Sequence, residues 1–148
     1  MVGVDGSEGS RRALRWAAAD AELRGWSIEA VAVWSNPYGG EMSLEFQAPY
    51  FRKDQLASRK KVEEQLTEAV SDAVAGLPTV TVHQVVVDGD PAEILCGRSA
   101  NADLLVVGSR GHGGFARLLL GSVSSACAHH CSCPIVIVPA PVDAPTAT

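Results

Sequence analysis

The hydrophobic positions of this chain form two patterns: short continuous apolar runs and longer segments with helical spacing. The apolar runs predict β-strands at residues 1–5, 27–34, 79–87, 103–108 and 134–139. Segments 8–24 and 52–75 carry apolar residues at helical spacing, and shorter helices are predicted after Asp90 and from Ser122 onward. Strands and helices therefore alternate along the chain.

Capping residues stand where these helices are predicted to begin or end. Gly25 follows the first helix, and Gly76 follows the second. Asp90 is the predicted N-cap of the third helix, and Pro91 takes its first helical position, where a missing N–H is harmless. The local signals thus agree with the hydrophobic pattern.

The alternation predicts a single α/β domain over residues 1–139, Rossmann-like, with an open parallel sheet covered by helices on both faces. Nearly continuous apolar strands are typical of strands buried on both sides, and 148 residues suit one domain. The first strand is short for a central strand, so we expect the native chain to start upstream of Met1. Residues 140–148 are rich in Pro and Ala, and we expect a disordered tail there.

In folds of this kind, ligands bind beyond the carboxyl ends of the strands, where the strand order reverses. This rule selects Asp5, Val33 with Trp34, residues 88–90 and the segment from Gly108 onward. Residues 35–51 form a long connection without a clear period, which is typical of a lid or a mobile segment.

Composition narrows the possible partners and the compartment. The net charge of −5 argues against broad contact with nucleic acid or an anionic membrane, which need clustered Lys and Arg. No apolar run reaches the roughly 20 residues of a membrane span, and the acidic start has no signal-peptide pattern. We therefore expect a cytoplasmic protein with reduced cysteines.

The segment after the fourth strand has the spacing G-x2-G-x9-G-S, from Gly108 and Gly111 to Gly121 and Ser122. Glycines let backbone N–H groups approach an anion closely, and the start of a helix favours negative charge. The hydroxyls of Ser122 and Ser124 are further candidate donors. The pattern is neither a Walker A loop nor a dinucleotide fingerprint. It predicts phosphate binding, and the alternative is a set of purely structural turns.

Other polar residues near this edge allow two interpretations each. Asp5 either contacts a ligand, which we favour, or bonds the amides of the following turn. Arg110 and His112 either reach phosphate or face solvent, and Arg117 is a weaker candidate of the same kind. No nucleophile elbow and no metal-holding acid set is evident, so we predict no catalytic residue.

The cysteines near the end of the chain raise the question of a metal site. Cys127 and Cys131 are four residues apart on a predicted helix, where His130 or Cys133 would complete a metal-binding set. Strong zinc signatures pair two such short motifs, and only one is present here. Because Cys127 and Cys131 share the apolar face of the helix with Val123, we expect buried thiols and no metal.

Three stretches of the chain resemble the universal stress protein family: "VGVDGSEGSRRALRWA", "VVVDGDPAEIL" and "LLVVGSRGHGGFARLLLGSVSSACAHHCSCPIVIVP". The resemblance covers nearly the whole chain. It implies a five-stranded parallel sheet in the order 3-2-1-4-5 and a homodimer formed through the final strand, residues 134–139. The family has members that bind ATP and members that do not, and the complete glycine pattern marks the binders.

The resemblance also implies a role for individual residues. The phosphates and the ribose are expected to lie among Gly108, Gly111, Gly121 and Ser122, with the backbones of Val123 and Ser124 at the phosphate end. The adenosine is expected to lie near Asp5, together with Gly3 and Val4. The backbone of Val33 is expected to contact the edge of the adenine.

The combined expectation is an ATP-binding regulatory protein of the stress response, with Mg²⁺ accompanying the nucleotide and an unknown protein as partner. Three alternatives stay open: a slow ATPase or phosphotransferase using the same pocket, a nucleotide-free dimeric scaffold, and a pocket that holds cyclic AMP.

Overall fold

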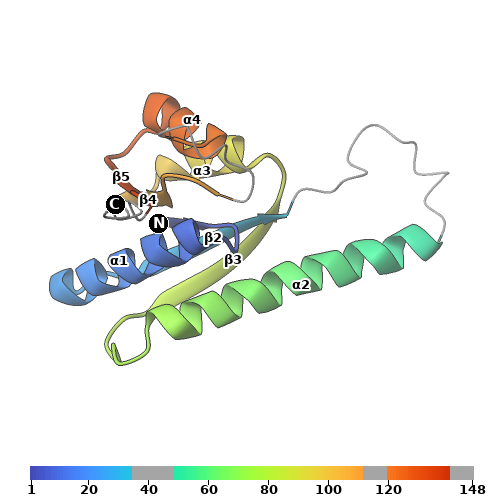
Figure 1. Cartoon of the computed structure of the whole chain (residues 1–148), viewed down its shortest axis with the longest axis horizontal. Coiled ribbons are helices and arrows are strands. Elements are labelled where there is room, and N and C mark those ends of the chain that lie inside the picture. Colours follow the sequence, from blue (N-terminus) through green and yellow to red (C-terminus); the bar gives the residue numbers. More distant parts are fainter. Residues whose placement is uncertain (35–48, 112–119, 141–148) are drawn as a thin grey trace, which may run out of the picture.

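The structure, a computed structural model, describes residues 1–34, 49–111 and 120–140, with the backbone alone for 49–55. Its elements run in the order β1 (Val2–Val4), α1 (Glu8–Arg24), β2 (Ile28–Trp34), α2 (Pro49–Ala73), β3 (Val82–Asp88), α3 (Pro91–Ser99), β4 (Leu105–Gly108), α4 (Ser122–His130) and β5 (Ile135–Val138). All strand pairs are parallel, and the sheet order is β3-β2-β1-β4-β5 (Figure 1). The predicted fold class and strand order are confirmed.

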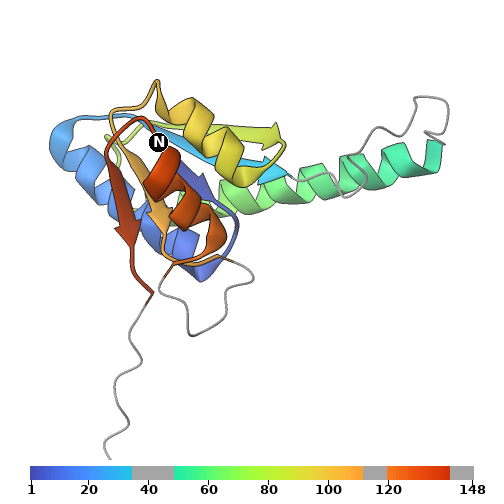
Figure 2. The ribbon, with the colours of Figure 1, turned by 90° about the horizontal axis from the view of Figure 1, so that it is seen from above.

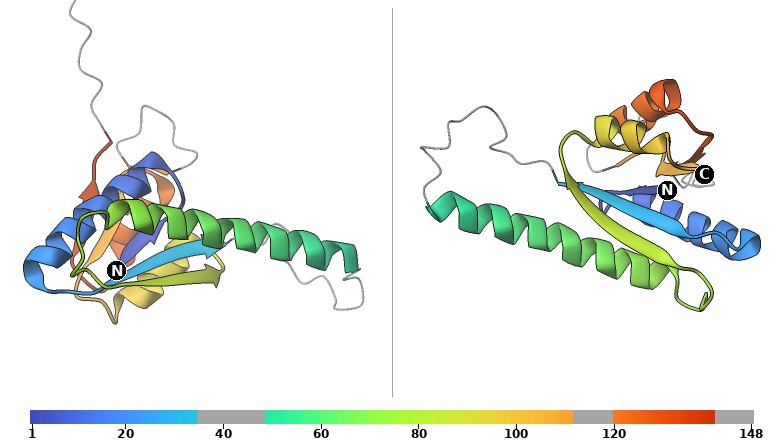
Figure 3. Two further views of the ribbon diagram at one scale, coloured as in Figure 1. Left: turned by 90° about the horizontal axis from the view of Figure 1, so that it is seen from below. Right: turned by 180° about the vertical axis from the view of Figure 1, so that it is seen from behind.

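The helices cover the two faces of the sheet in pairs. Helices α1 and α2 lie on one face, and α3 and α4 lie on the other (Figures 1 and 2). The N-terminal part of α2 extends beyond the end of β2, so only the C-terminal part of the helix packs against the strands (Figure 3). No helix in the described part of the chain has the length and apolar character needed to cross a membrane.

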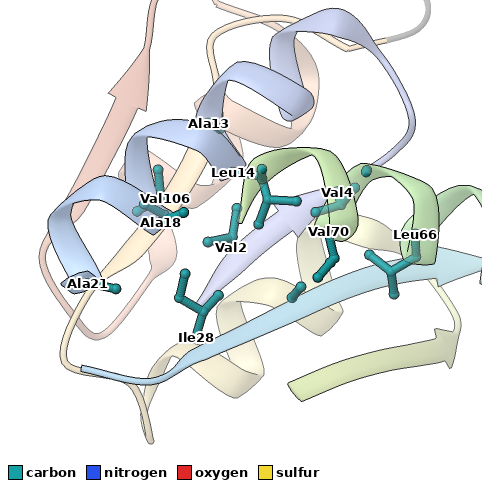
Figure 4. Packing of buried hydrophobic residues seen from close by; sticks show 14 of the residues in the cluster. Val2, Val4, Ala13, Leu14, Ala18, Ala21, Ile28, Leu66, Val70 and Val106 are labelled. Atoms are coloured by element: carbon teal, nitrogen blue, oxygen red, sulfur yellow. The ribbon is translucent and has the colours of Figure 1, made fainter. Parts of the chain in front are cut away.

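Each face has its own hydrophobic core. On the α1 face, small side chains of the helix pack against β1 and against Leu66 and Val70 of α2 (Figure 4). Ala13 and Ala18 are fully buried there, and their small volume lets α1 lie close to the sheet. The opposite core is formed by Val31, Leu95, Leu105, Val107 and Cys127. The sheet is thus sealed on both sides except at its ends.

Element boundaries follow the sequence prediction closely, with two corrections. Helix α2 begins at Pro49 instead of residue 52, since a proline is tolerated in the first turn of a helix. The other correction concerns β3. The strand begins at Val82 rather than at residue 79, because Val82 is already paired with Ile28, the first residue of β2. Upstream of Val82 there is no β2 residue left to pair with. Strand β3 is also half exposed, because it forms an edge of the sheet instead of being buried on both faces.

The predicted tail at residues 140–148 lies outside the described residues beyond position 140. Of the connection predicted over residues 35–51, residues 35–48 also lie outside the described residues, whereas residues 49–51 form the start of α2.

Candidate functional site

The strand order reverses between β1 and β4, and a cavity of about 430 Å³ lies at the carboxyl ends of these strands. Residues from the β1–α1 turn, β2, α3, β4 and the start of α4 line it. They are Gly3, Val4, Asp5, Ser10, Val31, Val33, Pro91, Leu95, Val107, Gly108, Arg110, Gly111, Gly121, Ser122, Val123 and Ser124. Its volume falls in the range of small-molecule sites, roughly 300–1,000 Å³.

The residues expected to contact the nucleotide all line this cavity, except His112 and Arg117, which lie outside the described residues. Trp34 and Asp90 were also expected near this edge, and they are used otherwise. The indole N–H of Trp34 donates to the Ser58 hydroxyl at 2.8 Å, and Asp90 caps α3.

Asp5 is held by the turn that follows β1. The N–H and the hydroxyl of Ser7 donate to Oδ1 of Asp5 at 2.9 and 2.6 Å. The Ser7 hydroxyl oxygen in turn accepts the N–H of Ser10 and caps α1. The turn-bonding alternative considered for Asp5 is therefore present, and the same carboxylate also lines the cavity.

The first two glycines of the pattern are required by the protein itself. A Cβ at Gly108 would lie 2.7 Å from the carbonyl carbon of Gly9 and 2.8 Å from its oxygen, so Gly108 lets β4 approach α1. A Cβ at Gly111 would collide with Oδ2 of Asp5. Backbone packing therefore excludes a larger residue at Gly108 whether or not a ligand is present, whereas a larger residue at Gly111 would require the Asp5 carboxylate to move.

The third glycine is different. A Cβ at Gly121 would find its nearest neighbours, Cα of Arg110 and the carbonyl oxygen of Ser109, at 3.6 Å, which is ordinary contact. Its φ of −77° and ψ of 171° are open to any residue. Within the described residues, neither space nor backbone conformation therefore demands a glycine at this position.

The loop before α4 is closed by hydrogen bonds to one carbonyl group. The N–H of Gly121 donates to the Ser109 carbonyl at 2.7 Å, and the Ser124 hydroxyl donates to the same oxygen at 2.9 Å. The Ser124 hydroxyl, considered above as a ligand donor, instead fixes the loop and is buried. Ser122 is exposed at the first position of α4.

The N-terminus of α4 has no side-chain cap. Gly121 occupies the N-cap position and has no side chain to accept a hydrogen bond from the first turn. The first N–H groups of a helix have no partner inside the helix, and the helix dipole adds partial positive charge there. Ser122, Val123 and Ser124 line the cavity, so this end of α4 can hold an anion.

The cavity also has an apolar part to its lining. Strand β2 continues beyond its last β1 pairing, Ala32 with Val4, so Val33 lies at the open end of the sheet. Val31, Leu95 and Val107 add further apolar side chains to this part of the lining. A cavity lined by both an apolar surface and an uncapped helix N-terminus suits a ligand with a flat organic part and a charged tail.

Sequence reasoning missed five lining residues: Ser10, Val31, Pro91, Leu95 and Val107. Two of them carried a usable signal. Val31 is two residues before Val33 and so faces the same side of β2, and Leu95 is one turn after Pro91 on α3. For the others, only the packing of α1, α3 and β4 around the cavity identifies them.

Comparison with known proteins agrees with this architecture. The universal stress protein family model matches residues 1–139. The chain is 37% identical over 138 residues to universal stress protein Rv2005c of Mycobacterium tuberculosis, which covers 93% of this chain and 44% of the relative. The chain thus spans less than half of that relative's length.

Solved structures share the fold. Universal stress protein UspA from Lactobacillus plantarum matches with a TM-score of 0.78 at 18% identity, over 93% of this chain and 95% of that one. A family protein from Arabidopsis thaliana with AMP bound has a TM-score of 0.61 at 20% identity, over 96% and 92% of the two chains. A universal stress protein in complex with cAMP has a TM-score of 0.58 at 24% identity, over 93% of each chain.

At these identities the solved structures show the fold alone, and the nucleotides belong to those proteins. The family model, however, spans nearly the whole sequence, and the strand order is the one expected of the family. The chain belongs to the universal stress protein family.

Proposed function

We propose that this chain binds ATP in the cavity at the carboxyl ends of β1 and β4 and acts as a regulatory protein of the stress response. The observation that carries the proposal is the N-terminus of α4. It opens onto the cavity without a side-chain cap, behind a glycine that the described protein does not need for its own packing.

In this proposal each part of the cavity takes one part of the nucleotide. The adenosine lies against the apolar wall of Val31, Val33 and Leu95, and the phosphates accept hydrogen bonds from the N–H groups of Ser122 to Ser124. Relatives crystallised with AMP and cAMP support an adenine nucleotide as the ligand class.

Mg²⁺ fits the same arrangement as a companion of the phosphates. Asp5 is the one carboxylate among the described lining residues, and Mg²⁺ prefers oxygen ligands from phosphates, carboxylates and water. We assign Asp5 as the residue that faces the ion, with its Oδ1 fixed by Ser7.

Titration calorimetry with ATP–Mg²⁺, AMP and cAMP tests the proposal. We expect a dissociation constant near the micromolar range for ATP, about −8 kcal/mol, and weaker binding of AMP, which lacks the phosphates that reach α4. Gly121→Ala should weaken ATP at least tenfold, about 1.4 kcal/mol, because its Cβ takes space on the cavity wall.

Gly97→Ala is the matched control, since Gly97 is exposed on α3 and has no atom within 4 Å of its added Cβ. Equal loss in both variants, or no heat with any nucleotide, contradicts the proposal and favours a nucleotide-free scaffold. Tighter binding of cAMP than of ATP would assign the pocket to the cyclic nucleotide. Phosphate release well above background would indicate an enzyme.

We further propose that the protein forms a homodimer through residues 134–139. Strand β5 lies at the edge of the sheet and is paired on one side with β4 within the chain. Exposed strand edges are usually covered or paired. Light scattering should give twice the mass of one chain, and a monomer at every concentration would refute this assembly.

A further inference from the structure

Three cysteines that do not line the cavity converge between α3 and α4. Cys96 lies on α3, Cys127 on α4, and Cys131 is the C-cap residue of α4. Their Sγ atoms all lie within 4.8 Å of one another, and those of Cys96 and Cys131 are 3.2 Å apart. We call these three residues the thiol cluster.

The composition of the cluster differs from what the sequence suggested. Cys127 and Cys131 were paired there with His130 or Cys133, whereas the fold adds Cys96, 31 residues before Cys127. Among the described residues, no other cysteine, histidine or acidic side chain joins the group. The cluster is therefore a set of three sulfur atoms with no harder donor.

The surrounding backbone fixes the positions of the three thiols. The N–H of Cys131 donates to the Cys127 carbonyl at 3.1 Å. The Ser99 hydroxyl donates to the Cys96 carbonyl at 2.6 Å and accepts the N–H of Ser132 at 2.9 Å, which ties the end of α3 to the end of α4. The sulfur atoms are thus held together before any ligand arrives.

The thiol cluster combines one buried cysteine with two cysteines that solvent can reach. Cys127 is 1% exposed and packs with Val31, Leu105 and Val107. Cys96 and Cys131 are partly exposed, which leaves an entry path from solvent.

The electrostatics of the cluster disfavour free thiolates at Cys96 and Cys127. Burial raises the pKa of the Cys127 thiol, and burial together with the neighbouring Cys131 raises the pKa of Cys96. Both α3 and α4 end at the cluster, and helix C-termini carry partial negative charge. A bound metal ion would favour the thiolate form instead, because it displaces the thiol protons on coordination.

We propose that Cys96, Cys127 and Cys131 form a binding site for one thiophilic metal ion of the Cu(I) class. Soft thiolate sulfur selects Cu(I), which accepts three-coordinate sulfur sites, whereas Zn²⁺ prefers four ligands and would need a water molecule as the fourth. On binding, each coordinating S–H transfers its proton to solvent and forms an S–Cu bond, with no change in oxidation state.

The test uses the full chain, reduced and kept under anaerobic conditions, with Cu(I) supplied as its acetonitrile complex against a chromophoric Cu(I) chelator. We expect one Cu(I) per chain and a near-ultraviolet thiolate-to-copper absorption band. Cys96→Ser and Cys131→Ser should each weaken the site at least about tenfold, since even supporting residues of metal sites have effects of that order.

Cys133→Ser is the matched control. Cys133 is partly buried on the same side of the sheet but lies outside the thiol cluster, so this variant should bind Cu(I) like the wild type. Circular dichroism establishes that each variant is folded. An equal effect of all three substitutions, or no effect of Cys96→Ser and Cys131→Ser, overturns the site.

Two further outcomes also overturn the proposal. The first is Zn²⁺ binding with the same cysteine dependence when Cu(I) fails to compete with the chelator. The second is a Cys96–Cys131 disulfide that forms on purification and persists under reductant, because the 3.2 Å separation would then reflect a redox pair instead of a metal site.

Discussion

Helices α3 and α4 pack side by side and both begin at the cavity, but their N-termini are built differently. At α3, the Asp90 carboxylate accepts the N–H groups of Ala92 and Glu93 at 2.9 and 3.0 Å, and Pro91 has no N–H to satisfy. At α4, Gly121 provides no cap. One helix end is thus capped within the chain, whereas the other has no side-chain cap, and we propose that its N–H groups bind the ligand.

A second contrast lies within the glycine pattern. Gly108 is required because the backbone of Gly9 approaches it closely, whereas an added Cβ at Gly121 meets only ordinary contacts. The glycine pattern therefore combines two roles: Gly108 serves the packing of the protein, and we propose that Gly121 serves the binding of the ligand. Substitutions at these positions should separate the two roles.

The largest expected effect comes from giving α4 the cap that α3 has. Gly121→Asp fits the φ and ψ of an N-cap and supplies a carboxylate to the first N–H groups. We expect ATP affinity to fall by about 100-fold, or 2.7 kcal/mol, while stability stays equal or rises by a few tenths of a kcal/mol. Calorimetry and urea unfolding measure the two quantities. Unchanged ATP affinity would show that the first N–H groups of α4 do not bind the nucleotide.

Gly108→Ala should act on stability. Its Cβ would meet the Gly9 backbone at 2.7 Å, and forced overpacking of this kind costs about 1–3 kcal/mol. Urea unfolding with Gly97→Ala as reference provides the measurement. A variant as stable as the wild type would show that α1 can move away from β4 at little cost.

Asp90→Ala should give the reverse of the Gly121→Asp result. Loss of the α3 cap is expected to lower the free energy of unfolding by about 1 kcal/mol, with ATP affinity unchanged. The same two measurements apply. If ATP binding weakened as much as stability fell, the α3 end would also be part of the ligand site.

The smallest predicted effect concerns the C-terminal end of α4, where the thiol of Cys127 makes the free energy of unfolding depend on pH. Burial holds the pKa of Cys127 above its ordinary value of 9.0, so above that pH the unfolded chain loses this proton before the folded one does. The contribution of the protonated Cys127 thiol to the free energy of unfolding is therefore fully present below about pH 9 and declines as the pH rises further. Urea unfolding at about pH 8 and pH 10 should show the decline, and Cys127→Ala should reduce it. An identical pH dependence in the variant would contradict the assignment.

Much of this molecule is predictable from local sequence. The small side chains of segment 8–24, followed by Gly25, defined α1 to the residue, and Asp90 with Pro91 marked the start of α3. The start of β3 was misplaced because a strand's length depends on its partner, and β2 begins only at Ile28. Local propensity contains no information on that pairing.

In the candidate site, too, some features could be predicted from the sequence and others depend on tertiary packing. The residues at the strand ends and in the glycine pattern were found because the topology brings such positions to one edge. The separate roles of Gly108 and Gly121, and the approach of Cys96 to Cys127, depend on how helices pack on the sheet. Spacing along the chain does not encode these contacts.

The most direct test of the nucleotide site is a crystal structure of the full chain grown with excess ATP and Mg²⁺. We expect phosphate oxygens about 2.7–3.2 Å from the backbone nitrogen atoms of Ser122 to Ser124, with the adenosine against Val31, Val33 and Leu95. A nucleotide bound elsewhere, or a cavity that stays empty at saturating ATP, would contradict the proposal.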